Sequence, residues 1–106
     1  MLASPGTAMA SNEEFCVFKN LGPGEACVDP TFRKVTRVNA LSINFSVCAG
    51  AFNSNGVEIG GWTCTIENGE TSNGNYDGSK FLKGAVYNND PTRSQVIGHG
   101  LEFYNP

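Results

Sequence analysis

The chain has no long hydrophobic run, little charge and no excess of positive charge. No segment approaches the roughly 18 consecutive apolar residues that a membrane-spanning helix needs, so membrane insertion is not expected. Charged residues make up 16% of the 106 residues, and the formal net charge is −3. Because nucleic-acid binding draws most of its affinity from a basic surface, this charge argues against a nucleic-acid partner.

Histidine is also scarce, since His99 is the single histidine, and no two cysteines form a Cys-x-x-Cys pair. A zinc site normally combines closely spaced ligands of these types, so neither a metal site nor a cofactor is predicted. An even number of cysteines in a small domain indicates disulfides formed in an oxidising, extracellular compartment. Two disulfides among Cys16, Cys27, Cys48 and Cys64 can be connected in three ways, and the spacing does not choose between them.

No segment has the apolar periodicity of an amphipathic helix. Short runs of β-branched and aromatic residues alternate instead with Asn-Gly, Asp-Gly and Pro-Gly turns. These runs predict an all-β fold, either a small antiparallel β-barrel or a sandwich, with about six to eight strands and two disulfides. Residues 1–12 are predicted to be a flexible N-terminal segment, which we interpret in part as the remnant of a processed N-terminus, and residues 13–106 a single β-barrel domain.

The clearest strand pattern lies between Leu41 and Val47, where apolar and polar residues alternate. This period predicts that Leu41, Ile43, Phe45 and Val47 face the core together. Farther along the chain, the alternation changes phase at the Gly-Gly pair of residues 60–61. A β-bulge there would bring the apolar residues on both sides of it to the core, and burial of both strand faces is the alternative.

No combination of residues indicates catalysis. A hydrolytic site needs a general acid and a general base side by side. His99 and Glu102 are separated by an odd number of positions, which places them on opposite faces of a strand. The apolar neighbours of His99 favour a structural histidine, so the protein is predicted not to be an enzyme.

Several residues are candidate surface or modification sites. Asn44 lies in an Asn-Phe-Ser sequon and is a candidate for glycosylation, with an unmodified exposed Asn as the equal alternative. Tyr76 lies in a turn-rich segment and is expected to be exposed. The basic residues Arg33, Lys34 and Arg37 are candidate surface contacts, although a solvated strand face also explains them.

The larger aromatic residues form a further candidate set. Trp62, Tyr76, Tyr87 and Tyr104 combine apolar rings with polar tips, as sugar-stacking or partner-binding surfaces do. A tryptophan close to a cysteine is more often packed in the core against a disulfide, and this is the preferred interpretation of Trp62.

The short strands, the four early cysteines and the acidic composition rich in Asn and Gly resemble the small secreted cysteine-rich proteins of filamentous fungi. The resemblance covers residues 13–106 and is greatest to the elicitor type that induces a hypersensitive response. It implies a secreted β-barrel that is recognised at a plant cell surface by an unknown protein or glycan and that triggers or modulates defence without catalysis. Self-association as a homodimer is compatible with the exposed edges of an all-β chain.

The alternative prediction is a small secreted hydrolase or an enzyme inhibitor. In composition the chain is similar to the small guanyl-specific ribonucleases of fungi. A hydrolase would need a cleft with converging polar groups. An inhibitor would present a rigid loop, for which residues 20–26 and 67–79 are candidates.

Overall fold

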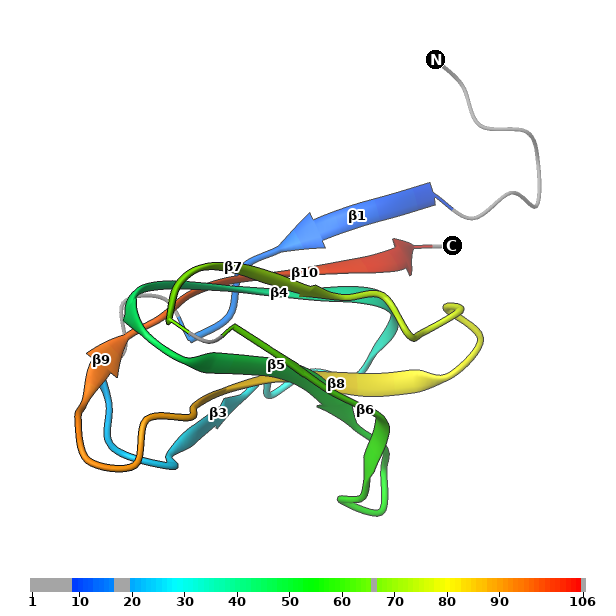
Figure 1. Ribbon diagram of the computed structural model, residues 1–106. Coiled ribbons are helices and arrows are strands. Elements are labelled where there is room, and N and C mark those ends of the chain that lie inside the picture. The colour runs from blue at the N-terminus through cyan, green and yellow to red at the C-terminus, as the bar shows by residue number, and fades with distance from the viewer. Residues whose placement is uncertain (1–8, 17–19, 66, 106) are drawn as a thin grey trace.

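The computed structural model describes residues 9–16, 20–65 and 67–105, and this part of the chain contains ten strands (Figure 1). They are β1 (Met9–Glu13), β2 (Asn20–Leu21), β3 (Ala26–Val28), β4 (Arg33–Phe45), β5 (Val47–Phe52), β6 (Glu58–Cys64), β7 (Glu67–Asn73), β8 (Phe81–Asn88), β9 (Gln95–Val96) and β10 (Gly98–Asn105). The described residues include no helix, so the predicted all-β fold is confirmed.

Most of the strands lie in two antiparallel layers. One layer has the order β1-β10-β4-β7 and the other the order β3-β8-β5-β6. The layers join where the start of β4 pairs with β8, through Arg33–Leu82 and Lys34–Phe81. The short strands β2 and β9 pair separately at one end (Figure 1). The domain is therefore an open sandwich of the jelly-roll type, so that the sandwich, and not the barrel, is the confirmed one of the two predicted architectures.

The core lies between the layers, where the strands turn one face inward. The buried apolar side chains come from both layers and include Val35, Val38, Ala40, Val47, Ala49, Ala51, Leu82, Val86, Leu101 and Phe103. The layers approach closely at Gly84, where a Cβ atom would lie 2.8 Å from Cδ1 of Leu101. The small residues of β5 and β8 thus make room for the larger side chains of the facing layer.

The inward face of β4 is the opposite of the one predicted. Val38, Ala40 and Ser42 are fully buried, whereas Leu41 is 44% exposed. Ser42 can occupy the inward face because its hydroxyl donates to Oε1 of Gln95 at 3.1 Å. A polar residue that is hydrogen-bonded in this way can be buried at little cost in free energy. The alternation of polar and apolar residues in the sequence therefore predicts the wrong inward face for this strand.

The alternating segment from Leu41 to Val47, which was predicted to be one strand, belongs to two strands. β4 ends at Phe45, the chain passes Ser46, and β5 begins in the other layer at Val47, which is buried. The pairing of β4 with β7 shifts register between Ser42 and Phe45, so inward and outward positions are not continuous along this segment. Phe45 is half-buried. The side chain of Ile43 lies outside the part of the chain that the structure describes.

The predicted bulge at residues 60–61 is confirmed. The pairing of β5 with β6 shifts register opposite Gly50, and Gly60 and Gly61 have φ angles of 80° and 76°. Glycine reaches these angles without the steric cost that other residues meet. The bulge does not bring both flanking apolar sets to the core, because Ile59 packs against the core whereas Trp62 lies on the outside of the sandwich.

The N-terminal segment is not flexible over the whole range predicted. Residues 9–13 form β1, which pairs with β10 from Met9–Asn105 to Glu13–Leu101. The prediction for residues 1–12 is therefore wrong for residues 9–12, and residues 1–8 lie outside the described part. The β1 sequence has little strand propensity of its own, so the free edge of β10 provides the reason for its conformation.

All four cysteines are paired, as predicted. Cys16 is bonded to Cys27, and Cys48 to Cys64. The second disulfide joins directly opposite positions of β5 and β6. The first ties the segment that follows β1 to β3.

Replacing Cys48 and Cys64 together with Ala should lower the free energy of unfolding by about 3 kcal/mol, because the cross-link no longer restricts the unfolded chain over a sequence separation of 16. The matched replacement of Cys16 and Cys27, whose separation is 11, should cost a few tenths of a kcal/mol less. Urea unfolding of both double variants measures the losses. A loss below about 1 kcal/mol for the Cys48–Cys64 variant would contradict this account.

Candidate ligand-binding surfaces

The outer face of the layer β3-β8-β5-β6 carries aromatic and aliphatic side chains where an antiparallel sandwich usually carries polar ones. On β8, Leu82 and Val86 belong to the core cluster, so the alternate positions point to the outer face, although Ala85 among them is also fully buried. The outward positions in register with one another are Phe81, Lys83, Ala85 and Tyr87 on β8, Cys48, Gly50 and Phe52 on β5, and Val28 on β3.

Trp62 of β6 lies flat over this outer face. A Cβ atom at Gly50 would lie 2.6 Å from Cε3, 2.8 Å from Cζ3 and 3.0 Å from Cδ2 of Trp62. Three consecutive ring atoms at such similar distances mean that the glycine lies under the flat face of the indole and not at its edge. The opposite indole face is therefore directed away from the sheet, and a residue larger than glycine at position 50 would displace the ring.

Two further rings fix the position of the indole. The ring of Phe52, from β5, lies 5.7 Å from that of Trp62 at an interplanar angle of 71°. The ring of Tyr87, from β8, lies 4.8 Å away at 87°. Both contacts are edge-to-face, which is a favoured geometry of aromatic pairs. The half-buried indole is thus held by neighbours on two strands, beside the Cys48–Cys64 disulfide.

Two lysines contribute positive charge close to this outer face, Lys83 on β8 and Lys34 at the start of β4, where the two layers join. Nζ of Lys83 lies 4.6 Å from the ring centre of Phe32, and Nζ of Lys34 lies 5.4 Å from that of Phe81. Both distances are within the roughly 6 Å range of a cation–π contact. Phe32 and Phe81 are 38% and 60% exposed, so this part of the surface is both aromatic and cationic.

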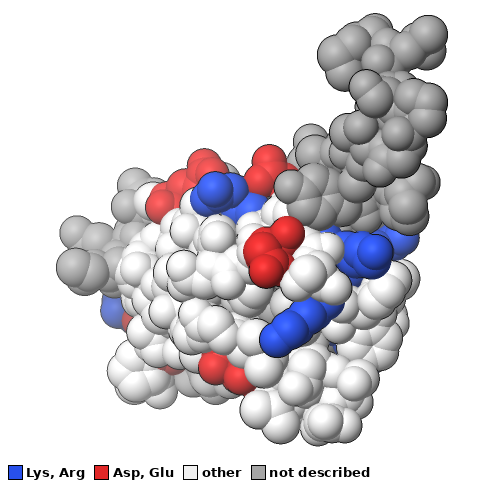
Figure 2. All heavy atoms as spheres, turned by 90° about the vertical axis from the view of Figure 1, so that its right-hand side faces the viewer, with Lys and Arg blue, Asp and Glu red and all other residues white. Residues whose placement is uncertain are grey.

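The basic residues predicted as surface contacts all have partners within the protein. Arg33 pairs with Glu13 at 2.6 Å, Arg37 pairs with Glu102 at 3.2 Å, and Lys34 has the ring contact described above. Figure 2 views the end of the sandwich at which β7 leads to β8, and acidic and basic side chains are interspersed there on a mostly uncharged surface. A ligand of the arginines would have to replace these internal partners, which makes them weak candidates for a binding site.

Tyr76 is buried and not exposed as predicted. Its side chain is 9% exposed, and a Cβ atom at Gly60 would lie 3.0 Å from its Cε1 atom. The glycine bulge therefore provides the space into which the ring turns. Tyr76 lines a pocket of about 320 Å³ that also includes the apolar side chains of Val35, Ile59 and Leu82, the segment Gly74–Gly78 and Lys80.

Two buried polar atoms in this region have no hydrogen-bond partner among the described residues, and only the first belongs to a residue that lines the pocket. They are the hydroxyl of Tyr76 and Oε1 of Glu58, which precedes the pocket residue Ile59. Burial and, after it, the negative charge of Glu58 raise the pKa of Tyr76 to about 12. Tyr76 therefore remains a neutral hydroxyl at physiological pH, and this group can both donate and accept a hydrogen bond.

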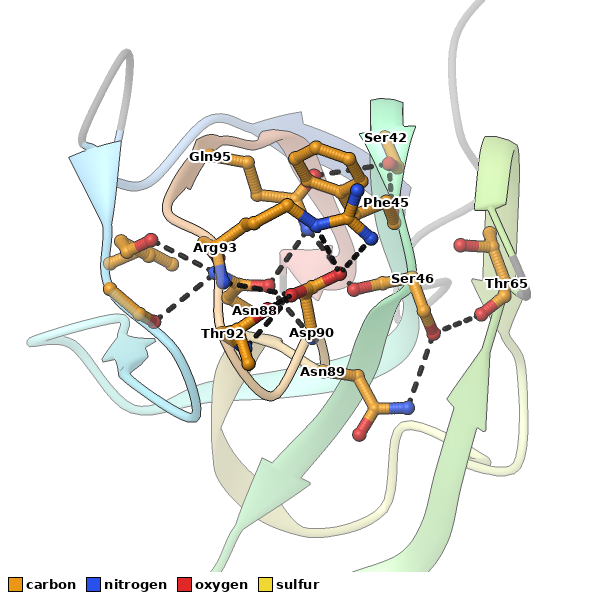
Figure 3. Close-up of polar contacts among 12 residues, drawn as sticks. Ser42, Phe45, Ser46, Thr65, Asn88, Asn89, Asp90, Thr92, Arg93 and Gln95 are labelled. Carbon is orange, nitrogen blue, oxygen red and sulfur yellow. Dashed lines mark hydrogen bonds and ion pairs between the residues drawn. The ribbon is translucent and has the colours of Figure 1, made fainter.

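A cluster of polar side chains closes the other end of the sandwich and is centred on the buried Asn88 (Figure 3). The side-chain nitrogen of Asn88 donates to the carbonyl oxygens of Leu21, Gly22 and Arg93, at 3.0, 3.2 and 2.6 Å. The side-chain oxygen accepts from Nε2 of Gln95 and from the backbone nitrogen of Asp90, both at 2.9 Å. Asn88 thus joins β2, β9 and the segment after β8.

Asp90 and Arg93 extend this cluster. Nη2 of Arg93 lies 2.8 Å from Oδ2 of Asp90, and the guanidinium carbon lies 3.7 Å from the ring centre of Phe45. Hydrogen bonds from the Arg93 side chain and then from the Thr92 backbone lower the pKa of Asp90 to about 2. Because these contacts are internal, the cluster holds the loop between β8 and β9 in place and is not a candidate ligand site.

The side chains of Asn44, His99 and Tyr104 lie outside the part that the structure describes, so glycosylation and a structural role for His99 stay predictions. Residues 67–73 form β7, so the predicted loop of residues 67–79 is partly strand.

Within the described ranges, no three His, Cys, Asp or Glu side chains gather as metal ligands, and no helix is long and apolar enough to cross a membrane.

No protein-family model and no curated protein sequence matches the chain. One solved structure with a related arrangement is a chain from a report entitled "Bacillus endospore appendages form a novel family of disulfide-linked pili". It is 8% identical, with a TM-score of 0.47, over 100% of this chain and 97% of the other. A likeness this distant carries no argument about function.

Proposed function

We propose that this protein works without catalysis and binds a glycan through the outward face of Trp62. The placement of the indole, flat over Gly50 and beside Phe52 and Tyr87, is the observation that carries this proposal. The sequence favoured a core position for Trp62. Its position outside the core supports the alternative, a sugar-stacking surface.

The physical basis is the match between an aromatic ring and a sugar ring. One face of a pyranose presents weakly polarised C–H groups, which are attracted to the negative π face of an indole. Since Trp62 is already held by its neighbours, little side-chain entropy would be lost on binding. The ammonium group of Lys83 and the hydroxyl group of Tyr87 lie on the same layer. Both groups can form hydrogen bonds with the hydroxyl groups at the rim of a sugar ring.

Replacing Trp62 with Ala should weaken glycan binding about 30-fold, equivalent to about 2 kcal/mol, because a central aromatic contact is lost. Isothermal titration with soluble β-linked hexasaccharides of glucose, N-acetylglucosamine and xylose measures this effect. At least one of them should bind the wild type. Since Trp62 is the single tryptophan of the chain, its fluorescence should change on binding.

Two further variants sharpen the experiment. Gly50→Ala should also weaken binding, because the added Cβ displaces the indole from the sheet. Phe81→Ala removes an aromatic residue that is 60% exposed in the same layer and should leave the affinity nearly unchanged. Unchanged binding by Trp62→Ala, or no binding of any hexasaccharide at millimolar concentration, would refute the proposal.

The biological setting that we propose is extracellular. Disulfides such as Cys16–Cys27 and Cys48–Cys64 persist in oxidising compartments, which supports secretion. The elicitor role implied by the sequence resemblance is a more specific form of this proposal, with the glycan or its carrier protein at a plant cell surface. Infiltration of leaves with the oxidised protein, with reduced and heat-denatured controls, tests that role, and Trp62→Ala should reduce the response.

A further inference from the structure

Lys34 and Lys83, the two lysines close to the outer face that carries Trp62, have no acidic partner. Within the described ranges, neither lysine forms an ion pair with a carboxylate. The other cations of these ranges each have a carboxylate nearby: the ion pairs are Arg33–Glu13, Arg37–Glu102 and Arg93–Asp90, and Lys80 interacts electrostatically with Asp77. Among the described cations, the unpaired positive charge is therefore concentrated at the outer face of one layer.

Aromatic rings hold both of these ammonium groups in place. Nζ of Lys83 lies 4.6 Å from the ring centre of Phe32, and Nζ of Lys34 lies 5.4 Å from that of Phe81. A ring orients the ammonium group but carries no net charge, so the group stays able to pair with an anion. Such an anion would not have to displace an internal carboxylate, as it would at the arginines. The two lysines are thus better placed than the arginines to bind an anionic ligand.

The lysines follow the indole of Trp62 in a row along β8. The ring of Phe52, which contacts the indole, comes from the residue directly opposite Lys83. Phe81 lies two residues, or about 7 Å, farther along β8 on the same face, and it is paired with Lys34. An extended oligosaccharide that stacks on Trp62 and follows β8 would therefore pass first Lys83 and then Lys34.

Two acidic residues lie near this row, and each has a buried carboxylate oxygen. Asp29, which follows β3, is 2% exposed. Glu58 is in register with Phe52 on the side away from Lys83, so two strand spacings, about 10 Å, separate the backbones of Glu58 and Lys83. The row itself therefore presents two positive groups and no negative one.

We propose that the glycan bound at Trp62 is acidic, and that negative groups at the edges of its sugar rings pair with Lys83 and Lys34. This inference names the ligand class of the proposed function and rests on it. A negative group at the edge of a pyranose leaves the C–H face of the ring free to stack on the indole. Carboxylates of uronic acids and sulfate esters share this chemistry, since an ammonium group recognises the charge of either.

Oligosaccharides with the same backbone test the inference on the wild-type protein. Cellohexaose and the hexasaccharide of β-1,4-linked glucuronic acid differ only in the group on C5, which is a hydroxymethyl in the first and a carboxylate in the second. At about 20 mM salt, isothermal titration should show at least about fivefold tighter binding of the acidic hexasaccharide. The ratio should fall toward one at about 500 mM salt, where the screening length is about 4 Å. Cellohexaose with sulfate esters on its hydroxymethyl groups, titrated alongside, distinguishes a sulfate from a carboxylate as the source of the charge.

Matched variants locate the positive charge that the acidic glycan requires. Lys83→Gln keeps hydrogen-bond donors but removes the charge, so it should lower the ratio of the two affinities to about two, and the addition of Lys34→Gln should lower it to about one. Lys80→Gln removes the same charge at a position that lines the pocket beside Tyr76 and should leave the ratio unchanged. A ratio near one for both acidic forms at low salt, or an equal effect of Lys80→Gln and Lys83→Gln, would overturn the inference.

These measurements separate the inference from the proposed function on which it rests. If a neutral hexasaccharide binds at Trp62 and neither acidic form binds more tightly, the proposed function stands and the inference fails. If the acidic hexasaccharide requires Lys83 but binds Trp62→Ala as tightly as the wild type, stacking on Trp62 is refuted, whereas charge recognition by the lysines stands.

Discussion

Replacing Asn88 with Asp should lower the free energy of unfolding by about 3–5 kcal/mol at neutral pH. The change preserves the size of the side chain but replaces a nitrogen that donates to the carbonyl oxygens of Leu21, Gly22 and Arg93 with a negatively charged oxygen. Because position 88 is fully buried, water cannot relieve the repulsion between the carboxylate and these carbonyl groups. Urea unfolding followed by circular dichroism measures the loss.

The pH dependence of this variant gives a second test. Burial and the neighbouring carbonyl oxygens raise the pKa of the new carboxyl group in the folded state above its value in the unfolded chain. The protonated carboxyl can again donate, so the difference from the wild type should shrink as the pH falls through the raised pKa. Asn89→Asp is the matched control, because Asn89 is exposed and its side chain donates to Ser46 Oγ at 3.1 Å. Equal losses at positions 88 and 89 would contradict the central role of Asn88.

Replacing Leu101 with Ala should cost about 2–5 kcal/mol, whereas the same change at Leu41 should cost less than about 1 kcal/mol. Leu101 is 1% exposed and lies against Gly84, so its loss leaves a cavity between the layers. Leu41 is 44% exposed and leaves none. Thermal and urea unfolding of the two variants makes the comparison. A larger loss at Leu41 would mean that the alternation in the sequence had identified the inward face of β4 correctly.

The features that could be predicted from the sequence depend on local chemistry. The four cysteines and the glycine-rich turns indicated a disulfide-linked all-β domain, and both features are determined by residue type. The bulge at residues 60–61 was predicted because two adjacent glycines coincide with a change of phase. The disulfide pairing could not be predicted, because it depends on which strands become neighbours in the folded chain.

The wrong predictions involve residues whose environment is determined by distant parts of the chain. Ser42 faces inward because Gln95 supplies a hydrogen-bond partner. Tyr76 is buried because the bulge at Gly60 leaves room for its ring. Residues 9–12 form a strand because β10 offers a free edge. Each of these partners is far away in the sequence, and no local pattern reveals them.

The Trp62 surface was only an alternative in the sequence because strand pairing brings its residues together. Tyr87 lies on a strand far from Trp62 in sequence, Gly50 lies on the preceding strand, and the bulge determines to which side of β6 the indole turns. A tryptophan, a glycine and an aromatic residue have no fixed spacing in such a site. Only the pairing of β5 with β6 and β8 brings them together.

The most direct test of glycan binding is an intermolecular nuclear Overhauser experiment. Trp62 is the single tryptophan, so labelling tryptophan alone with ¹³C makes its indole protons the only ones observed. In the presence of a bound β-linked hexasaccharide, we expect cross-peaks between the ring protons of the sugar and the indole protons of Trp62, and we expect Gly50→Ala to remove them. Cross-peaks that are absent from the wild type while the same hexasaccharide binds by calorimetry would place the sugar elsewhere and contradict the proposal.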